Sequence, residues 1–249
     1  MPLRHEGRQD TVRGAVDTTR REFLGVAAAC LALPARATAG VEALGPGQHP
    51  LGLEYDRDGL LYLPRGYVAG VAAPLVVLFH GAGGTAQSVT YAFPMADEHR
   101  VIILAPDSRD QRTWDLVLGA YGPDADFLST ALGQTLGRCS VDRQRMSVAG
   151  HSDGASYALS FGISAGDLFM QILAFSPGLM TPIDARGKPR IFISHGIDDN
   201  VMPIEATSRR FVPRLKGLGY DVTYREYAGR HAVPAEIVQA GFDWAFPRR

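Results

Sequence analysis

The chain contains little material for covalent cross-links or for metal chelation. It has two cysteines, at positions 30 and 139. The first falls in a segment that we expect to be removed, so the mature chain can form no internal disulfide and depends on packing alone. Cys139 has no cysteine or histidine near it, which indicates a small buried hydrophobe. Cys, His, Asp and Glu show no metal-ligand spacing, and we expect no metal and no cofactor.

An excess of charge of one sign is also missing. The 25 Lys and Arg residues nearly match the 26 Asp and Glu residues, for a net charge of −1. Without a basic excess, neither a nucleic-acid partner nor an anionic membrane surface is expected. The G-K-[ST] ending of a Walker loop and the G-x-G-x-x-G spacing are absent as well. No apolar run reaches the roughly 20 residues that span a bilayer, so we expect no stable membrane insertion.

The first 39 residues have the pattern of an export signal. Arg20 and Arg21 precede Phe-Leu, a short apolar stretch covers residues 25–33, and small residues offer cleavage after Ala37 or Ala39. The pattern is typical of a twin-arginine signal, which predicts recognition by the twin-arginine export machinery and a periplasmic or secreted bacterial protein. An amphipathic or disordered tail, or a lipoprotein signal ending at Cys30, fits the pattern less well.

Segments of strand and helix character alternate along the rest of the chain. The expected strands are 75–79, 101–106, 146–149, 172–175, 190–196 and 222–227, and the expected helices are 125–136, 155–161 and 205–215. This alternation predicts an α/β fold with a doubly wound, mostly parallel sheet and helices on both faces. The short connections leave no room for a large lid domain. Residues 40–249 fit one domain.

The pentapeptide Gly150-His151-Ser152-Asp153-Gly154 has the pattern G-x-S-x-G. A bare match is weak because these residue types are common. Here a strand precedes it and a helix follows, which indicates a nucleophile elbow rather than a structural turn. The two glycines lack Cβ atoms, so strand and helix can approach closely. Ser152 would stand at the tip, and the backbone N–H of Asp153 would face a developing oxyanion.

A serine nucleophile needs a base and an acid from elsewhere in the chain. Among the seven histidines, His231 is the best candidate for the base because it lies in a loop after the last expected strand. His99 ends a polar helical segment, and we assign it to a solvated face. The acid follows the strand 190–196, where Asp198 and Asp199 are adjacent and either could orient an imidazole. The order Ser, Asp, His is that of α/β-hydrolases.

The apolar run 75–79 is closed by the glycine-rich turn His80-Gly81-Ala82-Gly83-Gly84. Its composition fits a central parallel strand that is buried on both faces. A phosphate-binding loop is disfavoured by the missing motifs, and the turn is better interpreted as the donor of a second oxyanion N–H. Four residues near these motifs are candidates for lining the pocket, with Trp114 assigned to pocket or core: His80, Gly81, Trp114 and His151.

These motifs resemble those of single-domain esterases of the α/β-hydrolase superfamily, near the phospholipase/carboxylesterase and polyhydroxybutyrate-depolymerase-like groups. The resemblance covers roughly residues 51–246, through segments 62–67, 78–84, 113–115, 150–154, 175–178, 195–203 and 229–231. In that family the acid stands four residues after the His of the H-G turn, which implies Asp199. The residue after the first H-G donates an oxyanion amide, which implies Ala82. Arg230 departs from the glycine that often precedes the base and adds a charge at the rim.

The resemblance implies a serine esterase that acts on a small-molecule ester through an acyl-enzyme. Ser152 would be the nucleophile, His231 the base and Asp199 the acid, with Ala82 and Asp153 as backbone donors of the oxyanion hole. An acyltransferase or a secreted polyester depolymerase would use the same site with another acceptor or substrate. A catalytically silent binding protein on this scaffold is disfavoured, because all three triad residue types are present in order.

Overall fold

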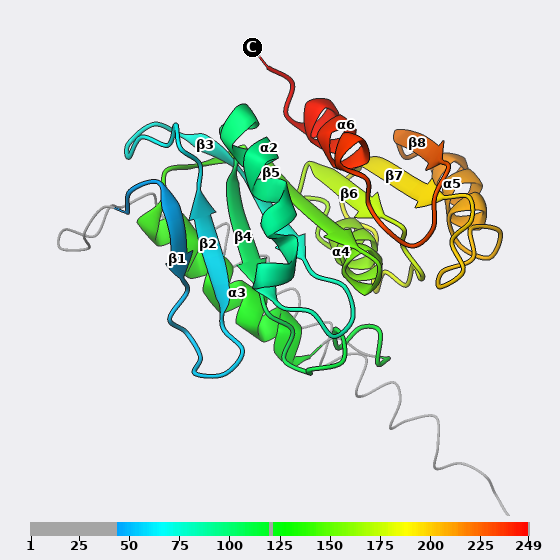
Figure 1. The fold of residues 1–249 in the computed structure, drawn as a ribbon, viewed down its shortest axis with the longest axis horizontal. Helices are drawn as coiled ribbons and strands as arrows, with labels where there is room; N and C mark the ends of the chain where they lie inside the picture. Colours follow the sequence, from blue (N-terminus) through cyan, green and yellow to red (C-terminus); the bar gives the residue numbers. More distant parts are fainter. Residues whose placement is uncertain (1–43, 120–121, 249) are drawn as a thin grey trace, which may run out of the picture.

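The structure is a computed structural model that describes residues 44–119 and 122–248. Its centre is an eight-stranded sheet with the order β1-β2-β4-β3-β5-β6-β7-β8 (Figure 1). The pairs from β4 through β3 to β8 are parallel, while β1 and β2 pair antiparallel at one edge. The strands are β1 (Gly47–Pro50), β2 (Gly59–Leu63), β3 (Ala73–Phe79), β4 (Ile102–Pro106), β5 (Val141–His151), β6 (Gln171–Phe175), β7 (Arg190–Gly196) and β8 (Val222–Tyr227).

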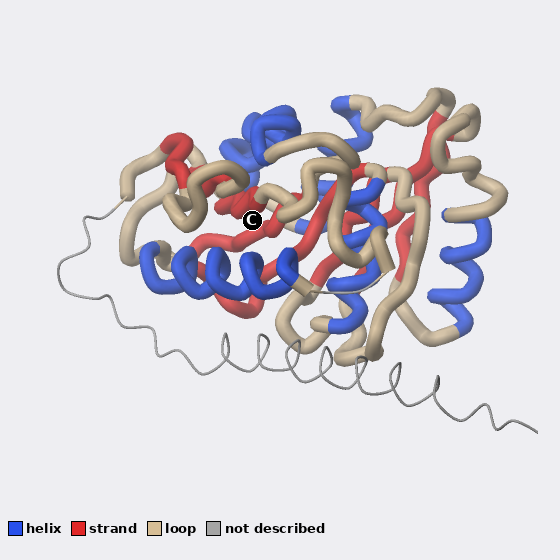
Figure 2. Tube along the Cα trace, turned by 90° about the horizontal axis from the view of Figure 1, so that it is seen from below, coloured by secondary structure: helices blue, strands red, loops and turns tan. Residues whose placement is uncertain are grey.

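Helices cover both faces of this sheet, as the view in Figure 2 shows. On β3 the side chains alternate with the two-residue period of a strand. Leu75, Val77 and Phe79 belong to a core shared with α3, α4 and α5, whereas Val76 and Leu78 belong to a core shared with η1, α2 and α6. The helices are the 3-10 helix η1 (Ala86–Ala92), α2 (Phe93–His99), α3 (Pro123–Arg138), α4 (Asp153–Ser164), α5 (Ser208–Gly217) and α6 (Ala235–Ala245).

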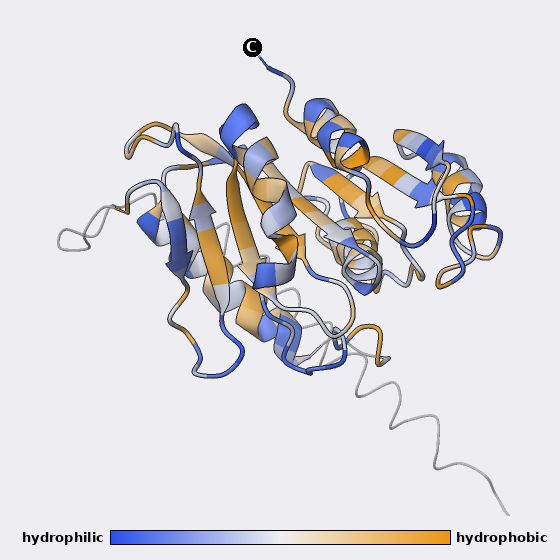
Figure 3. Ribbon diagram, viewed as in Figure 1, coloured by the Kyte–Doolittle hydropathy of each residue, from blue (hydrophilic) through white to orange (hydrophobic). Residues whose placement is uncertain are grey.

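The central strands β3 and β4 contain only apolar residues, which Figure 3 shows as hydrophobic colour along them. Every residue of β4, and every residue of β3 after Ala73, is buried. Strands that are covered on both faces can be continuous hydrophobic runs. The predicted doubly wound, mostly parallel fold is therefore confirmed, and all strands in residues 44–119 and 122–248 join this one sheet without a separate lid domain.

Two predicted helical features need correction. α5 begins at Ser208 rather than at position 205, because the preceding residues form turns in which Thr207 N donates to Ile204 O over 3.3 Å. His99 does not lie on a solvated face, since its side chain is buried and its Nδ1 lies 2.7 Å from the carbonyl oxygen of Phe246. The C-terminal segment covers this histidine, and segments so distant in sequence leave no local signal.

The antiparallel edge was not specified by the sequence analysis. β1 includes His49 and pairs with β2 through Gln48↔Tyr62 and His49↔Leu61, so it adds an edge strand upstream of the first predicted one. The predicted export signal at residues 1–39 lies outside the described residues. Within the described part, no helix combines the length and the apolar character needed to cross a membrane.

Candidate functional site

Ser152 stands at a sharp turn between β5 and α4. Its backbone has φ 58° and ψ −124°, a conformation that an L residue adopts only at a cost on the order of 1–3 kcal/mol. The flanking glycines make this turn sterically feasible. A Cβ at Gly150 would lie 2.3 Å from the backbone of Gly154, and a Cβ at Gly154 would lie 2.3 Å from the Phe79 carbonyl oxygen. Neither position accepts a side chain, as the elbow interpretation requires.

Three polar side chains from three separate elements meet at this turn. The Oγ of Ser152 donates to Nε2 of His231 over 2.8 Å, and Nδ1 of His231 donates to Oδ2 of Asp199 over 2.6 Å. The backbone N–H of Ser152 is anchored to Phe175 O at 3.0 Å. The sequence-predicted residues are therefore brought together in one continuous series of hydrogen bonds.

Asp199, and not Asp198, contacts the histidine. Asp199 is buried, whereas Asp198 is exposed. The Oδ1 atom of Asp199 accepts hydrogen bonds from Val201 N at 2.9 Å and Met202 N at 2.8 Å, which leaves Oδ2 free to face the imidazole. Burial by itself raises the pKa of Asp199, but the hydrogen bonds from His231 and these two amides outweigh it and hold the pKa below the ordinary value. The carboxylate is kept ionised at neutral pH.

The loops that carry the acid and the base are tied to each other. Ile197 N donates to Tyr227 O at 2.9 Å, and Asp198 N donates to Gly229 O at 3.0 Å. Gly196 permits this close approach, because a Cβ there would lie 2.5 Å from the carbonyl oxygens of Gly229 and Arg230. The position of His231 is thus set by backbone contacts across the carboxyl ends of β7 and β8.

The glycine-rich turn after β3 lies against Ser152. A Cβ at Gly81 would come 3.4 Å from the Cβ of Ser152. Gly83 N donates to Arg112 O at 2.7 Å, and Arg57 donates through Nη2 to Gly84 O at 3.0 Å, so both sides of the turn are anchored. Ala82 is exposed, and its backbone N–H has no hydrogen-bond partner among the described residues. This amide is available to a ligand.

Asp153 is the first residue of α4, where backbone N–H groups have no acceptor within the helix. Its side chain has a different role from its backbone amide, because Oδ2 accepts a hydrogen bond from Thr113 Oγ1 at 2.5 Å. The carboxylate is therefore used to anchor the loop before Trp114. Asp153 follows Ser152 directly in the chain, and Ala82 belongs to the glycine-rich turn whose Gly81 lies against Ser152.

Two of the four pocket candidates belong to the core instead. His80 and Trp114 are each 1% exposed. His80 donates through Nδ1 to Gly81 O at 2.7 Å and accepts at Nε2 from Ser108 N at 3.1 Å. Trp114 donates through Nε1 to His80 O at 2.8 Å, with its ring against Phe79. Both side chains support the glycine-rich turn from the core side, and for Trp114 the core was one of the two predicted positions.

The other two candidates lie beside the reacting groups. Gly81 contacts the nucleophile as described, and the ring of His151 lies 4.9 Å from that of His231, centroid to centroid. Burial, reinforced by the charge of His231, lowers the pKa of His151 to about 4. His151 therefore stays neutral at physiological pH. Its ring packs on that of His231, beside the turn that carries Ser152.

A residue that the sequence analysis left without a role completes this region. This residue is His195, the buried histidine of β7, and its Nε2 atom lies 3.2 Å from Oδ2 of Asp199. The only sequence signal was its place in an H-G turn before the acid. In residues 44–119 and 122–248, this region included, no group of three His, Cys, Asp or Glu side chains could hold a metal ion.

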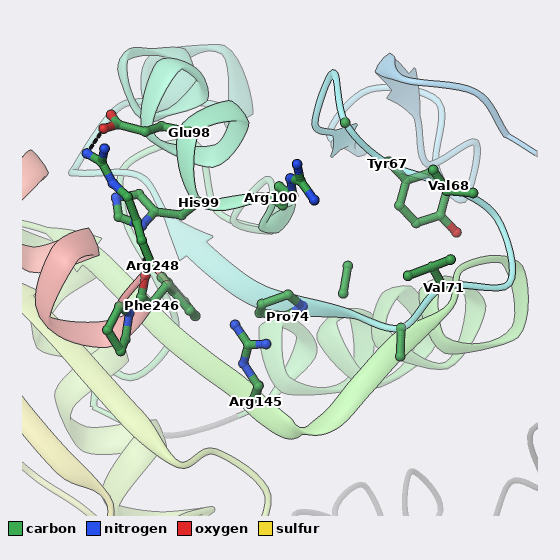
Figure 4. A pocket seen from close by; sticks show the side chains of 14 residues that line it. Tyr67, Val68, Val71, Pro74, Glu98, His99, Arg100, Arg145, Phe246 and Arg248 are labelled. Atoms are coloured by element: carbon green, nitrogen blue, oxygen red, sulfur yellow. Dashed lines mark hydrogen bonds and ion pairs between the residues drawn. The ribbon is translucent and has the colours of Figure 1, made fainter.

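A cavity of about 510 Å³ lies at the opposite edge of the sheet. Its walls are the loop after β2, the end of α2, Arg145 on β5 and the C-terminal residues (Figure 4). Arg248 pairs with Glu98, and Arg100 and Arg145 project into the opening. Arg145 precedes Ser152 by seven residues, which is about 23 Å at roughly 3.3 Å per strand residue. The cavity is not part of the site around Ser152.

Comparison with known proteins gives one family match. The model of the family named Esterase, with the description "Putative esterase", matches residues 52–203. This range includes the glycine-rich turn, the Ser152 elbow and Asp199, and it ends before His231. Acyl-protein thioesterase 1 of Gibberella zeae is 30% identical over 105 residues, which cover 38% of this chain. The alignment spans 44% of that relative, less than half of its length.

Solved structures share the fold at lower sequence identity. The crystal structure of esterase PE8 gives a TM-score of 0.63 at 21% identity, covering 75% of this chain and 96% of that one. The fluorophosphonate-binding serine hydrolase FphF of Staphylococcus aureus gives a TM-score of 0.66 at 15% identity, covering 82% and 100%. At these identities the likeness establishes the common α/β fold.

Proposed function

Because this chain belongs to the Esterase family and is a serine esterase, we propose that it hydrolyses small carboxylic esters through an acyl-enzyme formed on Ser152. The observation that carries the proposal is the series of short contacts from Ser152 Oγ to His231 and on to Asp199, at 2.8 and 2.6 Å. Each link has the donor and acceptor that proton transfer from the hydroxyl requires.

In the acylation step, Ser152 Oγ attacks the ester carbonyl carbon while its proton passes to Nε2 of His231. The carbonyl oxygen gains the electron pair of the π bond, and the amides of Ala82 and Asp153 stabilise the resulting oxyanion. Collapse of the tetrahedral intermediate breaks the bond to the alcohol oxygen, which takes the proton from His231. Asp199 keeps Nδ1 protonated and stabilises the imidazolium.

The deacylation step repeats this chemistry with water. Nε2 of His231 takes a proton from the water as its oxygen attacks the acyl carbon, and the second collapse returns that proton to Ser152 Oγ. An acyltransferase would use an alcohol in place of water, and a polyester depolymerase would present an insoluble substrate to the same residues. Product analysis with water and with added alcohols separates hydrolysis from transfer.

The test combines covalent labelling with turnover. The mature protein is treated with a fluorophosphonate probe, the labelled peptide is identified by mass spectrometry, and p-nitrophenyl ester hydrolysis is followed in parallel. We expect one label, on Ser152, and loss of turnover in proportion to labelling. Labelling of another residue, or turnover that persists in the fully labelled protein, overturns the proposal. If the protein hydrolyses none of the esters, the alternative of a non-catalytic binding protein on this scaffold is supported instead.

The acyl group is proposed to be short, of about two to six carbons. The described chain has no lid domain, so a long acyl chain would stay partly in water and each further methylene would gain less than the ~0.8 kcal/mol of full burial. A p-nitrophenyl series from two to sixteen carbons measures this preference through kcat/KM. A maximum at twelve or more carbons contradicts it. A thioester belongs in the same series, because one relative is named an acyl-protein thioesterase.

We propose further that residues 1–39 direct twin-arginine export and that residues 40–249 work in the periplasm or outside the cell. The support is the paired arginines followed by an apolar stretch and A-x-A sites. Replacing Arg20 and Arg21 by Lys should leave active precursor in the cytoplasm. Unchanged periplasmic activity after cell fractionation would contradict the export signal.

A further inference from the structure

His195 has three polar neighbours and no exposure to solvent. Its Nδ1 lies 2.7 Å from Ser208 Oγ at the start of α5, and its Nε2 lies 2.7 Å from Met202 O and 3.2 Å from Asp199 Oδ2. Both His195 and Ser208 are 0% exposed. The side chain therefore lies directly behind the carboxylate that faces His231.

The chemistry of the neighbours determines which ring nitrogen carries the proton. Met202 O and Asp199 Oδ2 are both acceptors without a hydrogen, so an unprotonated Nε2 would face two repulsive oxygen atoms. Nε2 must carry the proton. Nδ1 then has a lone pair, which the hydroxyl of Ser208 satisfies by donating to it. Burial also lowers the pKa of His195, which keeps the second proton off the ring.

We propose that His195 is a positioning residue that holds the carboxylate of Asp199 in line with His231. It does so as the Nε2–H tautomer, which the Ser208 hydroxyl fixes. This inference rests on the proposed function of the same site. With Val201 N and Met202 N on Oδ1, and His195 beside Oδ2, the carboxylate is held on three sides and its remaining direction is toward His231.

The arrangement links the acid to a helix that touches no reacting atom. Ser208 begins α5, and the turn before this helix is closed by Thr207 Oγ1 donating to Pro203 O at 3.0 Å. The loop from Gly196 to Pro203 is thus anchored to the start of α5. Other ionisable groups whose charge acts on His195 are His231 in the base loop, His151 at the elbow and Glu226 on β8.

The test uses matched pairs of variants. His195→Phe keeps a planar ring and removes the donor, while His195→Gln can return an N–H near the Nε2 position. Ser208→Ala removes the hydroxyl that fixes the tautomer, and Ser208→Thr restores it. Ser194→Ala is the control, because Ser194 directly precedes His195 on β7 and its buried hydroxyl has no hydrogen-bond partner among the described residues.

We expect His195→Phe to lower kcat roughly 10-fold to 100-fold with little change in KM, because the missing donor misorients a group that acts only through His231. Asp199 would then present more negative charge to the imidazole, so the acid limb of the kcat/KM profile should move to higher pH by roughly half a unit or more. Ser208→Ala should move it in the same direction by less. His195→Gln and Ser208→Thr should recover most of both losses.

All rates are divided by the number of sites titrated with the fluorophosphonate. A purely structural role would lower the number of titratable sites or the Tm, and it would leave the pH limb of the remaining sites in place. An unmoved limb in both His195→Phe and Ser208→Ala overturns the inference, as does a Ser208→Ala variant that matches Ser194→Ala. If His195→Phe does not fold, the Ser208 pair decides. Failure of wild-type Ser152 to be labelled overturns the proposed function separately.

Discussion

The two ends of β5 carry polar side chains that are used in different ways. At the carboxyl end, Ser152 begins a series of hydrogen bonds that ends at a fully buried carboxylate side chain. Toward the amino end, Arg145 of β5 projects into a cavity of about 510 Å³, together with Arg100 at the end of α2. The end near Arg145 has a cavity and two arginines. The end at Ser152 has a strained backbone and a series of hydrogen bonds between acid and base. The proposed ester cleavage uses the second set of features.

Glycines distinguish the same two ends. At the carboxyl edge, a Cβ on Gly150, Gly154 or Gly196 would come within 2.5 Å of backbone atoms. At the amino edge, a Cβ on Gly66 would meet only the side chain of Arg100, at 3.6 Å, which is ordinary contact. Close backbone approach therefore excludes a side chain at the glycines beside Ser152 and His231, but not at the glycine that lines the cavity. This contrast can be tested by substitutions at both ends.

The largest difference is expected between Ser152→Ala and Arg145→Gln. Removing the nucleophile should lower kcat by about 10⁴ or more, since the triad acts as a unit, and His231→Ala should match it. Arg145→Gln should leave kcat/KM within about twofold, because the side chain lies about 23 Å away along the strand. Steady-state p-nitrophenyl ester kinetics measure both. A folded Ser152→Ala variant with a tenth of wild-type kcat would refute the assignment.

The two adjacent carboxylates provide the next contrast. Asp199→Asn should cost about 10³–10⁴ in kcat, because an amide can hold the wrong tautomer of His231. Asp198→Asn should change kcat by less than about threefold, because that side chain is exposed and only its backbone N–H is used. The same kinetics apply. Equal losses in the two variants would mean that the acid is shared or misassigned.

A methyl group alone should disturb the carboxyl edge. Gly196→Ala forces the base loop to move, since the new Cβ would lie 2.5 Å from the Arg230 carbonyl oxygen, and displacement of His231 by about 1 Å can cost on the order of 10²-fold in kcat. The control is Gly133→Ala in α3, where nothing lies within 4 Å. It should keep full activity and add about 0.5–1 kcal/mol of stability. Full activity in Gly196→Ala would show that the loops are not rigidly tied.

The smallest effect is a pH dependence of stability. His151 has its pKa lowered to about 4 by burial first and by His231 second. Below pH 6.5 the unfolded chain takes up a proton that the folded chain does not, so the free energy of unfolding should fall between pH 6.5 and 4. We expect a loss on the order of 2 kcal/mol from this residue. Urea unfolding at pH 7 and 4.5 should show a smaller loss in His151→Gln. An equal loss in both proteins would contradict the prediction.

Local patterns predicted the elements that are continuous in sequence. The apolar runs of β3, β6 and β7, the strand-like residues of β8 and the helical patterns of α3 and α4 are all properties of neighbouring residues. The G-x-S-x-G pattern predicted the turn for the same reason, because its two glycines are required by close contacts within and beside that one turn. The edge strand β1, by contrast, is only four residues long and alternates between exposed and half-buried positions, which gives a weak signal.

Roles that depend on distant segments were not visible in the sequence. His80 adjoins the glycine-rich turn in the chain and Trp114 lies in a separate loop, and the structure buries both beneath that turn. His99 has polar sequence neighbours, and the C-terminal segment covers it. Residue order cannot report such burial, because each contact joins positions tens to more than a hundred residues apart.

The sequence by itself determined the fold class, the strained serine turn and the types of residue that an ester-cleaving site needs. Only the tertiary structure decided how they meet: that Asp199 faces His231 while Asp198 faces solvent, that Gly196 lets the base loop approach, and that His195 stands behind the acid. The reason is physical. A period or a turn is a property of neighbouring residues, whereas a hydrogen bond between side chains requires the carboxyl ends of separate parallel strands to meet at one edge of the sheet.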